Sequence, residues 1–363
     1  MTATADAHAT DKHVILLHQA ANGAYPACPS FTQYPHVWLR DGSFIAHAMD
    51  LVGEPASAAR FHAWVASTIL HHEAELRALV DGAARGASFD EGAFLPARYA
   101  VDGGWRNDGW PAFQLDGYGL WLWSLCEHAA TNGSAPSDDL ARAADLVARY
   151  VAAFWDEPCY DVWEEHRSQL HTSTLASTLA GLRAYTRLGI GADERVASAI
   201  ASLEAMLRDE CVVDGRFVKY VANPVVDASL LWLATPLAVV AADDPRMVAT
   251  VAEIERTLVV DGGLMRFATD TFYGGGAWIL LTAWLGWHHA RRGEHGRARA
   301  CLEWIERQRD AAGLLPEQVP TARTNPRFLR YWTRRWGTSA KPLLWSHAMT
   351  IVLRAALEPD RAA

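Results

Sequence analysis

The sequence lacks any cysteine pattern that could organise a fold or a metal site. Its five cysteines are an odd number, they are widely spaced, and none forms a CxxC pair. A disulfide framework or a thiolate metal site needs paired, suitably spaced cysteines, so both are excluded. We therefore expect reduced, mostly buried thiols and no metal centre.

Long basic blocks and long apolar runs are also missing. Acidic residues outnumber basic ones, 42 Asp and Glu against 33 Lys and Arg, and the formal net charge is −9. Without a basic block we expect no nucleic-acid partner. The apolar run at 228–242 is too short for a membrane span and contains Pro236. The first residues have neither the basic region nor the apolar core of an export signal, so we expect a cytoplasmic protein with no membrane partner.

Motifs for phosphate and metal binding are absent as well. The glycine-rich segment TDTFYGGG at 269–276 has neither the GxGxxG nor the Walker spacing. The paired histidines at 71–72 and 288–289 are adjacent on predicted helices and point to different faces. We expect no cofactor.

Tryptophan, in contrast, is abundant: 16 residues, more than the 11 phenylalanines or the 10 tyrosines. An indole offers a broad apolar face and one N–H donor, which suits stacking on sugar rings. Each single Trp is more simply explained as a core residue. As a group they favour a glycan or aromatic ligand.

Apolar residues at spacings of three and four predict an all-α protein of about twelve helices. These run roughly over 12–22, 41–52, 55–80, 114–130, 136–155, 172–188, 191–208, 226–240, 243–257, 275–292, 294–310 and 342–357. A short strand is expected near 215–221. Helix pairs with tight turns alternate with long loops, as in a closed double ring of helices with its loops gathered at one end. We expect a single domain over 1–363, with 1–12 as a flexible N-terminus.

Five loop segments concentrate the polar and aromatic residues, and long loops in a compact domain are usually functional. They are residues 34–44, 107–117, 160–173, 266–278, and 313–320 followed by 341–348. Glu164 follows a Trp and Glu317 follows an apolar stretch, so burial would raise the pKa of either carboxyl. Two facing carboxyls are the equipment for glycoside hydrolysis. Taken singly, each Glu is also explained as favourable placement at a helix start.

Charged residues in aromatic surroundings admit two interpretations. Arg40 and Asp41 lie between Trp38 and Phe44, and either form a salt bridge with Asp41 as a helix cap or act as a clamp for sugar hydroxyls. Arg266, near Asp270 and Tyr273, admits the same pair of interpretations.

In order along the chain, these segments resemble glycoside hydrolase family 15, the glucoamylase family. VWLRDGSF is similar to the family's W-x-R-D segment, YDVWEEH to its D-x-W-E-E segment, and LLPEQV with LLWSHA to the catalytic-base and closing segments. The resemblance spans about residues 30–350. It implies an (α/α)6 barrel and an inverting, exo-acting α-glucosidase with the catalytic loops at one end.

The resemblance also implies a role for each matching residue. Glu164 matches the general acid, Glu317 the general base, and Tyr34 a tyrosine beside the base and the attacking water. The residues that match substrate-binding positions are Trp38, Arg40, Asp41, Trp110, Trp163, Glu165, Arg266 and Trp345. Inversion needs room for a water, so we expect the two carboxyls to lie about 6.5–9.5 Å apart.

Two departures from the family pattern bear on specificity. Ala112 replaces a second pocket arginine, which changes the expected contacts at subsite +1. Phe272 replaces a tyrosine that bonds the equivalent of Tyr34, which would leave Tyr34 freer to join proton transfer. Phe272 and the short chain together resemble the small bacterial members of the family. This resemblance implies small α-1,6-linked gluco-oligosaccharides such as isomaltose as substrate.

Three questions stay open at this point. The same machinery could hydrolyse α-1,4 or α,α-1,1 linkages, as glucoamylases and trehalases do, and the loop 322–340 is expected to take part in that choice. A catalytically silent sugar-binding barrel is the non-enzymatic alternative. The oligomeric state is not indicated by the sequence.

Overall fold

The inner ring of the protein is built from the helices that are buried around most of their circumference. In the computed structural model, which describes residues 2–105, 109–191 and 193–358, these are α2 (Leu39–Leu51), α5 (Asp116–Asn132), α7 (Thr172–Leu188), α10 (Ile279–Arg291) and α13 (Leu344–Leu357). In α10 every residue from Ile279 to Ala290 is buried. Because such a helix has no polar face to turn to water, it must lie inside the ring.

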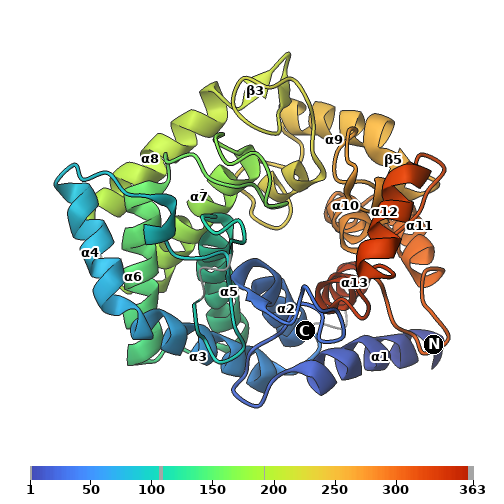
Figure 1. Ribbon diagram of the computed structural model, residues 1–363, viewed down its shortest axis with the longest axis horizontal. Coiled ribbons are helices and arrows are strands. Elements are labelled where there is room, and N and C mark those ends of the chain that lie inside the picture. Colours follow the sequence, from blue (N-terminus) through green and yellow to red (C-terminus); the bar gives the residue numbers. More distant parts are fainter. Residues whose placement is uncertain (1, 106–108, 192, 359–363) are drawn as a thin grey trace.

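The ring closes in chain order. α2 packs on α5 and α5 on α7; the short 3₁₀ helix η2 (Ala228–Leu233) bridges α7 and α10; α10 packs on α13, which returns to α2. Figure 1 looks into this ring. The molecule is an (α/α)6 barrel, as the sequence predicts.

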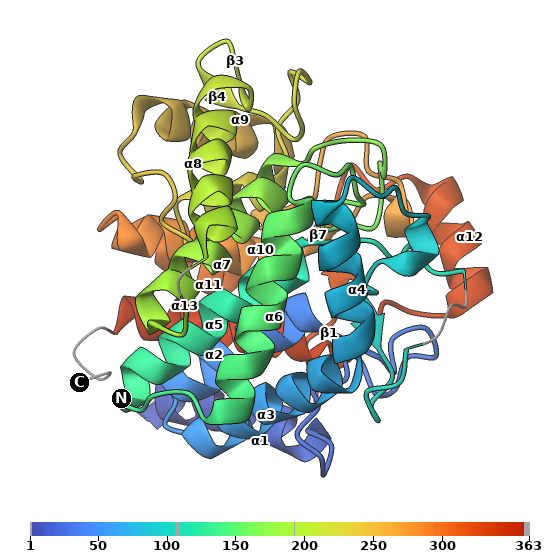
Figure 2. The same cartoon turned by 90° about the vertical axis from the view of Figure 1, so that its left-hand side faces the viewer.

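Further helices, most of them amphipathic, form the outer layer. They are α1 (Thr2–His18), α3 (Pro55–His71), α4 (Glu73–Ala84), α6 (Asp138–Phe154), α8 (Glu194–Asp209), α9 (Pro245–Leu258) and α11 (His295–Glu306). Figures 1 and 2 show them around the inner helices. α5 and α7 approach so closely that a Cβ on Gly119 would lie 2.4 Å from the Ser177 carbonyl oxygen. Glycine is therefore required at this crossing.

Short strands order the loops at the end where the inner helices begin. β1 (Val37–Trp38) pairs with β2 (Arg98–Tyr99), and β3 (Val212–Val213) with β4 (Arg216–Phe217). A four-stranded antiparallel sheet has the order β5 (Val259–Val260), β6 (Gly263–Leu264), β7 (Ala277–Trp278) and β8 (Gln318–Val319). β1 leads directly into α2 and β7 into α10, so these strands fix the loops against the inner helices. The remaining short helices are η1 (Glu91–Ala93) and η3 (Phe272–Gly274).

Four expectations need correction. The expected flexible segment 1–12 is helical from residue 2 onward, and Asp11 is fully buried. The expected helix 55–80 is two helices that meet at His72. The expected helix 226–240 is reduced to η2, because Pro236 has no N–H and disfavours a helical residue before it. The expected loop 322–340 contains the helix α12 (Pro326–Trp336), capped by the Asn325 side chain, which accepts from Arg327 N.

None of the helices within the described residues is both long enough and apolar enough to cross a lipid bilayer.

Candidate active site

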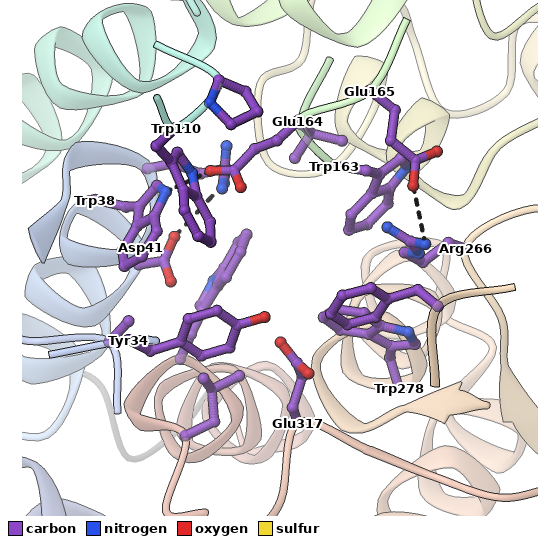
Figure 3. A pocket seen from close by; sticks show the side chains of 17 residues that line it. Tyr34, Trp38, Asp41, Trp110, Trp163, Glu164, Glu165, Arg266, Trp278 and Glu317 are labelled. Atoms are coloured by element: carbon purple, nitrogen blue, oxygen red, sulfur yellow. Dashed lines mark hydrogen bonds and ion pairs between the residues drawn. The ribbon is translucent and has the colours of Figure 1, made fainter. Parts of the chain in front are cut away.

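A cavity of about 310 Å³ opens among the loops that precede the inner helices. Its wall contains every residue that the sequence predicts for the site: Tyr34, Trp38, Arg40, Asp41, Trp110, Trp163, Glu164, Glu165, Arg266, Phe272, Glu317 and Trp345. The part of the motif at 107–117 that spans Asn107 and Asp108 lies outside the described residues. Figure 3 shows the cavity with Glu164 and Glu317 on opposite sides.

Glu164 is carried by a tight turn that precedes α7. Its φ of 65° is left-handed, which is uncommon for a residue other than glycine, Asn or Asp. Its Oε1 accepts a 2.6 Å hydrogen bond from Trp38 Nε1. Burial raises the pKa of Glu164, and this outweighs the Arg40 charge and the hydrogen bond from Trp38, which lower it. A raised pKa favours the protonated form that a general acid needs.

Glu317 lies just before β8 and is only 4% exposed. Burial raises its pKa to about 8, although the hydrogen bond that Gln318 Nε2 donates to Glu317 Oε2 and the Arg266 charge favour ionisation. The Tyr34 hydroxyl points toward the Glu317 carboxyl (Figure 3). Tyr34 thus lies where the sequence places it, beside the carboxyl predicted to be the base.

The backbone that carries Glu317 is fixed by the last inner helix. From α13, Ser346 Oγ donates to Pro316 O at 2.9 Å, and His347 Nε2 accepts from Leu315 N at 3.1 Å. Because Nε2 accepts, the proton of a neutral His347 sits on Nδ1, which lies 2.6 Å from the Asp11 carboxylate. The start of the chain therefore supports the segment that holds Glu317.

Arg40 and Asp41 form the expected ion pair at the wall of the cavity. Arg40 Nη1 donates to Gln114 Oε1 at 2.9 Å and contacts Asp116 Oδ2 at 3.1 Å, and its Nε lies 3.5 Å from Asp41 Oδ2. Both side chains also line the cavity. Asp41 lies in the first turn of α2, whose N-cap is Trp38, so it is not itself the cap. Burial raises the pKa of Asp41 to about 7 against the opposing effect of Arg40.

Arg266 faces the cavity from the opposite wall. Its guanidinium forms two hydrogen bonds with Asp270 and lies 3.3 Å from Glu165 Oε1. Aromatic rings surround it at 5.0 to 5.6 Å: Trp163, Phe267, Phe272 and Trp278. A cation in such surroundings is held in one orientation by its carboxylate and by the ring faces.

Indole and phenyl rings form most of the remaining wall. Trp110 packs edge-on against Trp38, with ring centroids 6.0 Å apart, and Trp345 lies beneath Arg40. Phe272 stacks on Trp278. A small cavity with flat apolar walls, charged clamps and two facing carboxyls has the equipment to bind a sugar ring and transfer a proton to its glycosidic oxygen.

Comparison with known proteins agrees with this chemistry. The sequence model of the glycosyl hydrolases family 15 matches residues 11–355. The chain belongs to glycosyl hydrolase family 15. It is therefore a glycoside hydrolase, as the sequence predicts.

One relative is similar to this chain over most of both sequences. The isomaltose glucohydrolase of Kribbella flavida is 43% identical over 348 residues, which is 94% of this chain and 89% of that protein. A trehalase of Thermoplasma acidophilum is 24% identical over 79% of this chain and 51% of its own length. The chain thus spans about half of the trehalase.

Two solved structures are similar to this chain in fold. A glycosidase matches with a TM-score of 0.93 at 41% identity, covering 97% of this chain and 96% of its own. The Saccharomycopsis fibuligera glucoamylase matches with a TM-score of 0.74 at 14% identity, covering 100% of this chain and 97% of its own. At that identity the likeness shows the barrel fold alone.

Some residues that shape this family 15 site were not singled out from the sequence. Trp278 lines the cavity, while Gln114 and Asp116 hold Arg40. Trp278 ends the predicted loop 266–278, and its place directly before an inner helix was the available signal. Gln114 and Asp116 hold Arg40 from behind, and they lie in the predicted loop 107–117 at the start of the inner helix α5, so the same signal was available for them.

Proposed function

We propose that this family 15 protein is an inverting, exo-acting α-glucosidase that releases β-glucose from the non-reducing end of small α-1,6-linked gluco-oligosaccharides such as isomaltose. The observation that carries the proposal is the placement of Glu164 and Glu317 on opposite sides of one small cavity (Figure 3). The printed name of the Kribbella relative supports the choice of isomaltose.

The two carboxyls divide the chemistry between them. Glu164 donates its proton to the glycosidic oxygen as the bond to the anomeric carbon breaks. A water attacks that carbon from the opposite face, and Glu317 in its ionised form accepts a proton from the water, so the configuration inverts. Tyr34, whose hydroxyl points toward Glu317 (Figure 3), orients the water and can take part in the proton transfer.

The remaining wall residues hold the sugar. Arg40 and Asp41 offer donors and an acceptor to the hydroxyls of the non-reducing glucose, and Arg266 adds donors from the opposite side. Trp38, Trp110, Trp163, Glu165, Phe272 and Trp345 complete the walls. A cavity of about 310 Å³ lies at the lower end of the range for ligand pockets, which favours removal of one sugar at a time.

Location is a separate part of the proposal. All five cysteines are free, and each is buried. Reduced thiols are typical of a cytoplasmic protein, which would meet imported disaccharides rather than polymers. We expect the protein in the cytoplasmic fraction.

The decisive experiment compares glucose release from isomaltose, maltose, trehalose and isomaltotriose at equal concentrations. Proton NMR identifies the first anomer formed, and Glu317→Ala is measured alongside. We expect rapid isomaltose cleavage that yields β-glucose and is lost in the variant. Trehalose as the best substrate would favour the activity named for the Thermoplasma relative, α-glucose as first product would exclude inversion, and inactivity on all four would favour a silent barrel.

A further inference from the structure

A buried ion cluster lies behind the loop that carries Glu164. Lys219, which is 5% exposed, places Nζ 3.2 Å from Asp161 Oδ2 and 3.1 Å from Asp227 Oδ2. Both aspartates are buried as well, and none of the three residues lines the cavity. The cluster therefore cannot touch a substrate bound there.

Asp161 holds the turn that presents Glu164. Its Oδ1 accepts from Trp163 N at 3.0 Å and from Glu165 N at 2.8 Å, and its carbonyl accepts from Glu164 N at 2.8 Å. These bonds use the consecutive N–H groups of residues 163–165. They stabilise the left-handed conformation of Glu164, which a residue with a side chain does not favour by itself.

Asp227 holds the neighbouring indole. It accepts hydrogen bonds from Trp163 Nε1 at 2.9 and 3.1 Å, and its Oδ1 accepts from Ser229 N and Ser229 Oγ. Trp163 stands beside Glu164 on the cavity wall (Figure 3). The two aspartates thus fix both the acid's backbone and the ring next to it.

Lys219 is the cation that joins these two supports. Its own backbone is anchored, because Lys219 O accepts from Thr172 N at the start of α7 and Lys219 N donates to Val225 O. Its Nζ lies 3.7 Å from the centroid of the Phe267 ring. Burial acts to lower the pKa of Lys219, but Asp227 and Asp161 outweigh it and raise the pKa, so the ammonium keeps its charge.

Removal of this cation would leave two buried carboxylates without their common partner. A buried unpaired carboxylate either takes up a proton or moves toward water. In both cases Asp161 would lose the fixed acceptor geometry on which the 163–165 turn depends.

We propose that Lys219 is a positioning residue for the general acid: by pairing with Asp161 and Asp227 together, it holds the 161–165 turn so that Glu164 points at the glycosidic oxygen. This proposal rests on the proposed function, because it takes Glu164 as the proton donor. It assigns Lys219 an effect on leaving-group protonation and none on the attack of water.

The test uses two substrates that differ in their need for that proton. Isomaltose has a poor leaving group that must be protonated, whereas the fluoride of α-glucosyl fluoride is weakly basic and departs with little help. We expect Lys219→Met to lower kcat on isomaltose by about 10- to 100-fold and kcat on the fluoride by less than about threefold. Lys219→Arg, which keeps the charge, should recover most of the isomaltose activity.

Equal losses of kcat on both substrates, or unchanged kcat on isomaltose, would overturn the proposal. Lys12→Met, which removes the surface lysine paired with Glu54, is the matched control and should match the wild type on both substrates. If Lys219→Met does not fold, as judged by circular dichroism and thermal melting, the double variant Lys219→Met/Asp227→Asn leaves only Asp161 charged and is measured against Asp227→Asn.

Glu164→Gln separates this proposal from the proposed function. It should show the same selective loss on isomaltose, larger than that of Lys219→Met. If Glu164→Gln shows no such selectivity, the assignment of the acid fails. If it does while Lys219→Met does not, only the role of Lys219 fails.

Discussion

At the residue scale, the site contains a carboxyl whose burial disfavours the charged form. Glu317 is 4% exposed and its pKa is raised to about 8, whereas an unfolded glutamate titrates near 4.5. A group whose pKa is raised on folding stabilises the folded protein below its unfolded pKa and loses that contribution as pH rises through its folded pKa. Glu317 therefore makes the protein less stable as pH rises from about 4.5 to about 8.

Glu317→Gln removes this ionisation, since glutamine cannot lose a proton. The free energy of unfolding of the variant relative to the wild type should rise across pH 4.5 to 8, by up to roughly 4 kcal/mol at 1.36 kcal/mol per pKa unit. Urea unfolding at several pH values measures it. Glu75→Gln, an exposed site on α4, is the control. A stability difference that does not change with pH would contradict the prediction.

At the element scale, α12 packs against a residue that lines the cavity. None of its residues is buried, yet Trp332 packs edge-on against Phe272, with ring centroids 4.3 Å apart, and stacks near Phe31. Phe272 in turn stacks on Trp278 in the cavity wall. Trp332 therefore joins α12 to a residue of the cavity wall.

Trp332→Ala should remove that contact and let Phe272 move. We expect kcat/KM on isomaltose to fall about tenfold, mainly through a higher KM, because small shifts in positioning groups are costly. Steady-state kinetics measure the change. Tyr331→Ala, at a neighbouring position that is 68% exposed, is the matched control and should leave KM unchanged. Equal effects of the two substitutions would show that α12 does not act through Phe272.

The elements also show what the sequence could and could not predict. Helices with a clear apolar stripe were placed closely, and α7 has the bounds expected for it, Thr172–Leu188. α12 was missed although its apolar residues lie on one face, because its many arginines favoured an interpretation of the segment as a solvated loop. The predicted residues that line the cavity lie in short motifs that could be recognised in the sequence. Lys219 did not, because its place beside Asp161 and Asp227 depends on chain folding over long separations.

At the scale of the whole molecule, the first and last helices close the ring together. The buried Asp11 of α1 accepts hydrogen bonds from Arg309, from Arg354 and from His347. Burial acts to raise the pKa of Asp11, but His347 and Arg309 outweigh it and hold the pKa well below its usual range. Asp11 thus stabilises the protein above its unfolded pKa near 3.8, and the contribution is lost as pH falls through its folded pKa.

Asp11→Asn would remove the buried one of the two carboxylates that Arg309 and Arg354 share, and would leave both arginines paired with Glu306 alone. We expect the free energy of unfolding to fall by about 3 kcal/mol at pH 7, with the difference shrinking as pH falls below about 4. Thermal and urea unfolding measure it. Lys12→Ala, on the same helix in a half-exposed pair with Glu54, should cost less than about 1 kcal/mol. A loss for Asp11→Asn no larger than that would contradict the role given to the buried cluster.

The support of Glu317 by α13 has a consequence for synthesis on the ribosome. Domains fold as their chain emerges, and this ring can close only after its last inner helix has left the exit tunnel. Until then the inner faces of α2 and α10 stay uncovered, and the Leu315–Pro316 backbone lacks its bonds to Ser346 and His347. A nascent chain that stops short of α13 therefore exposes apolar surface and lacks the contacts that fix Glu317, so catalytic competence arrives only after α13 has been synthesised.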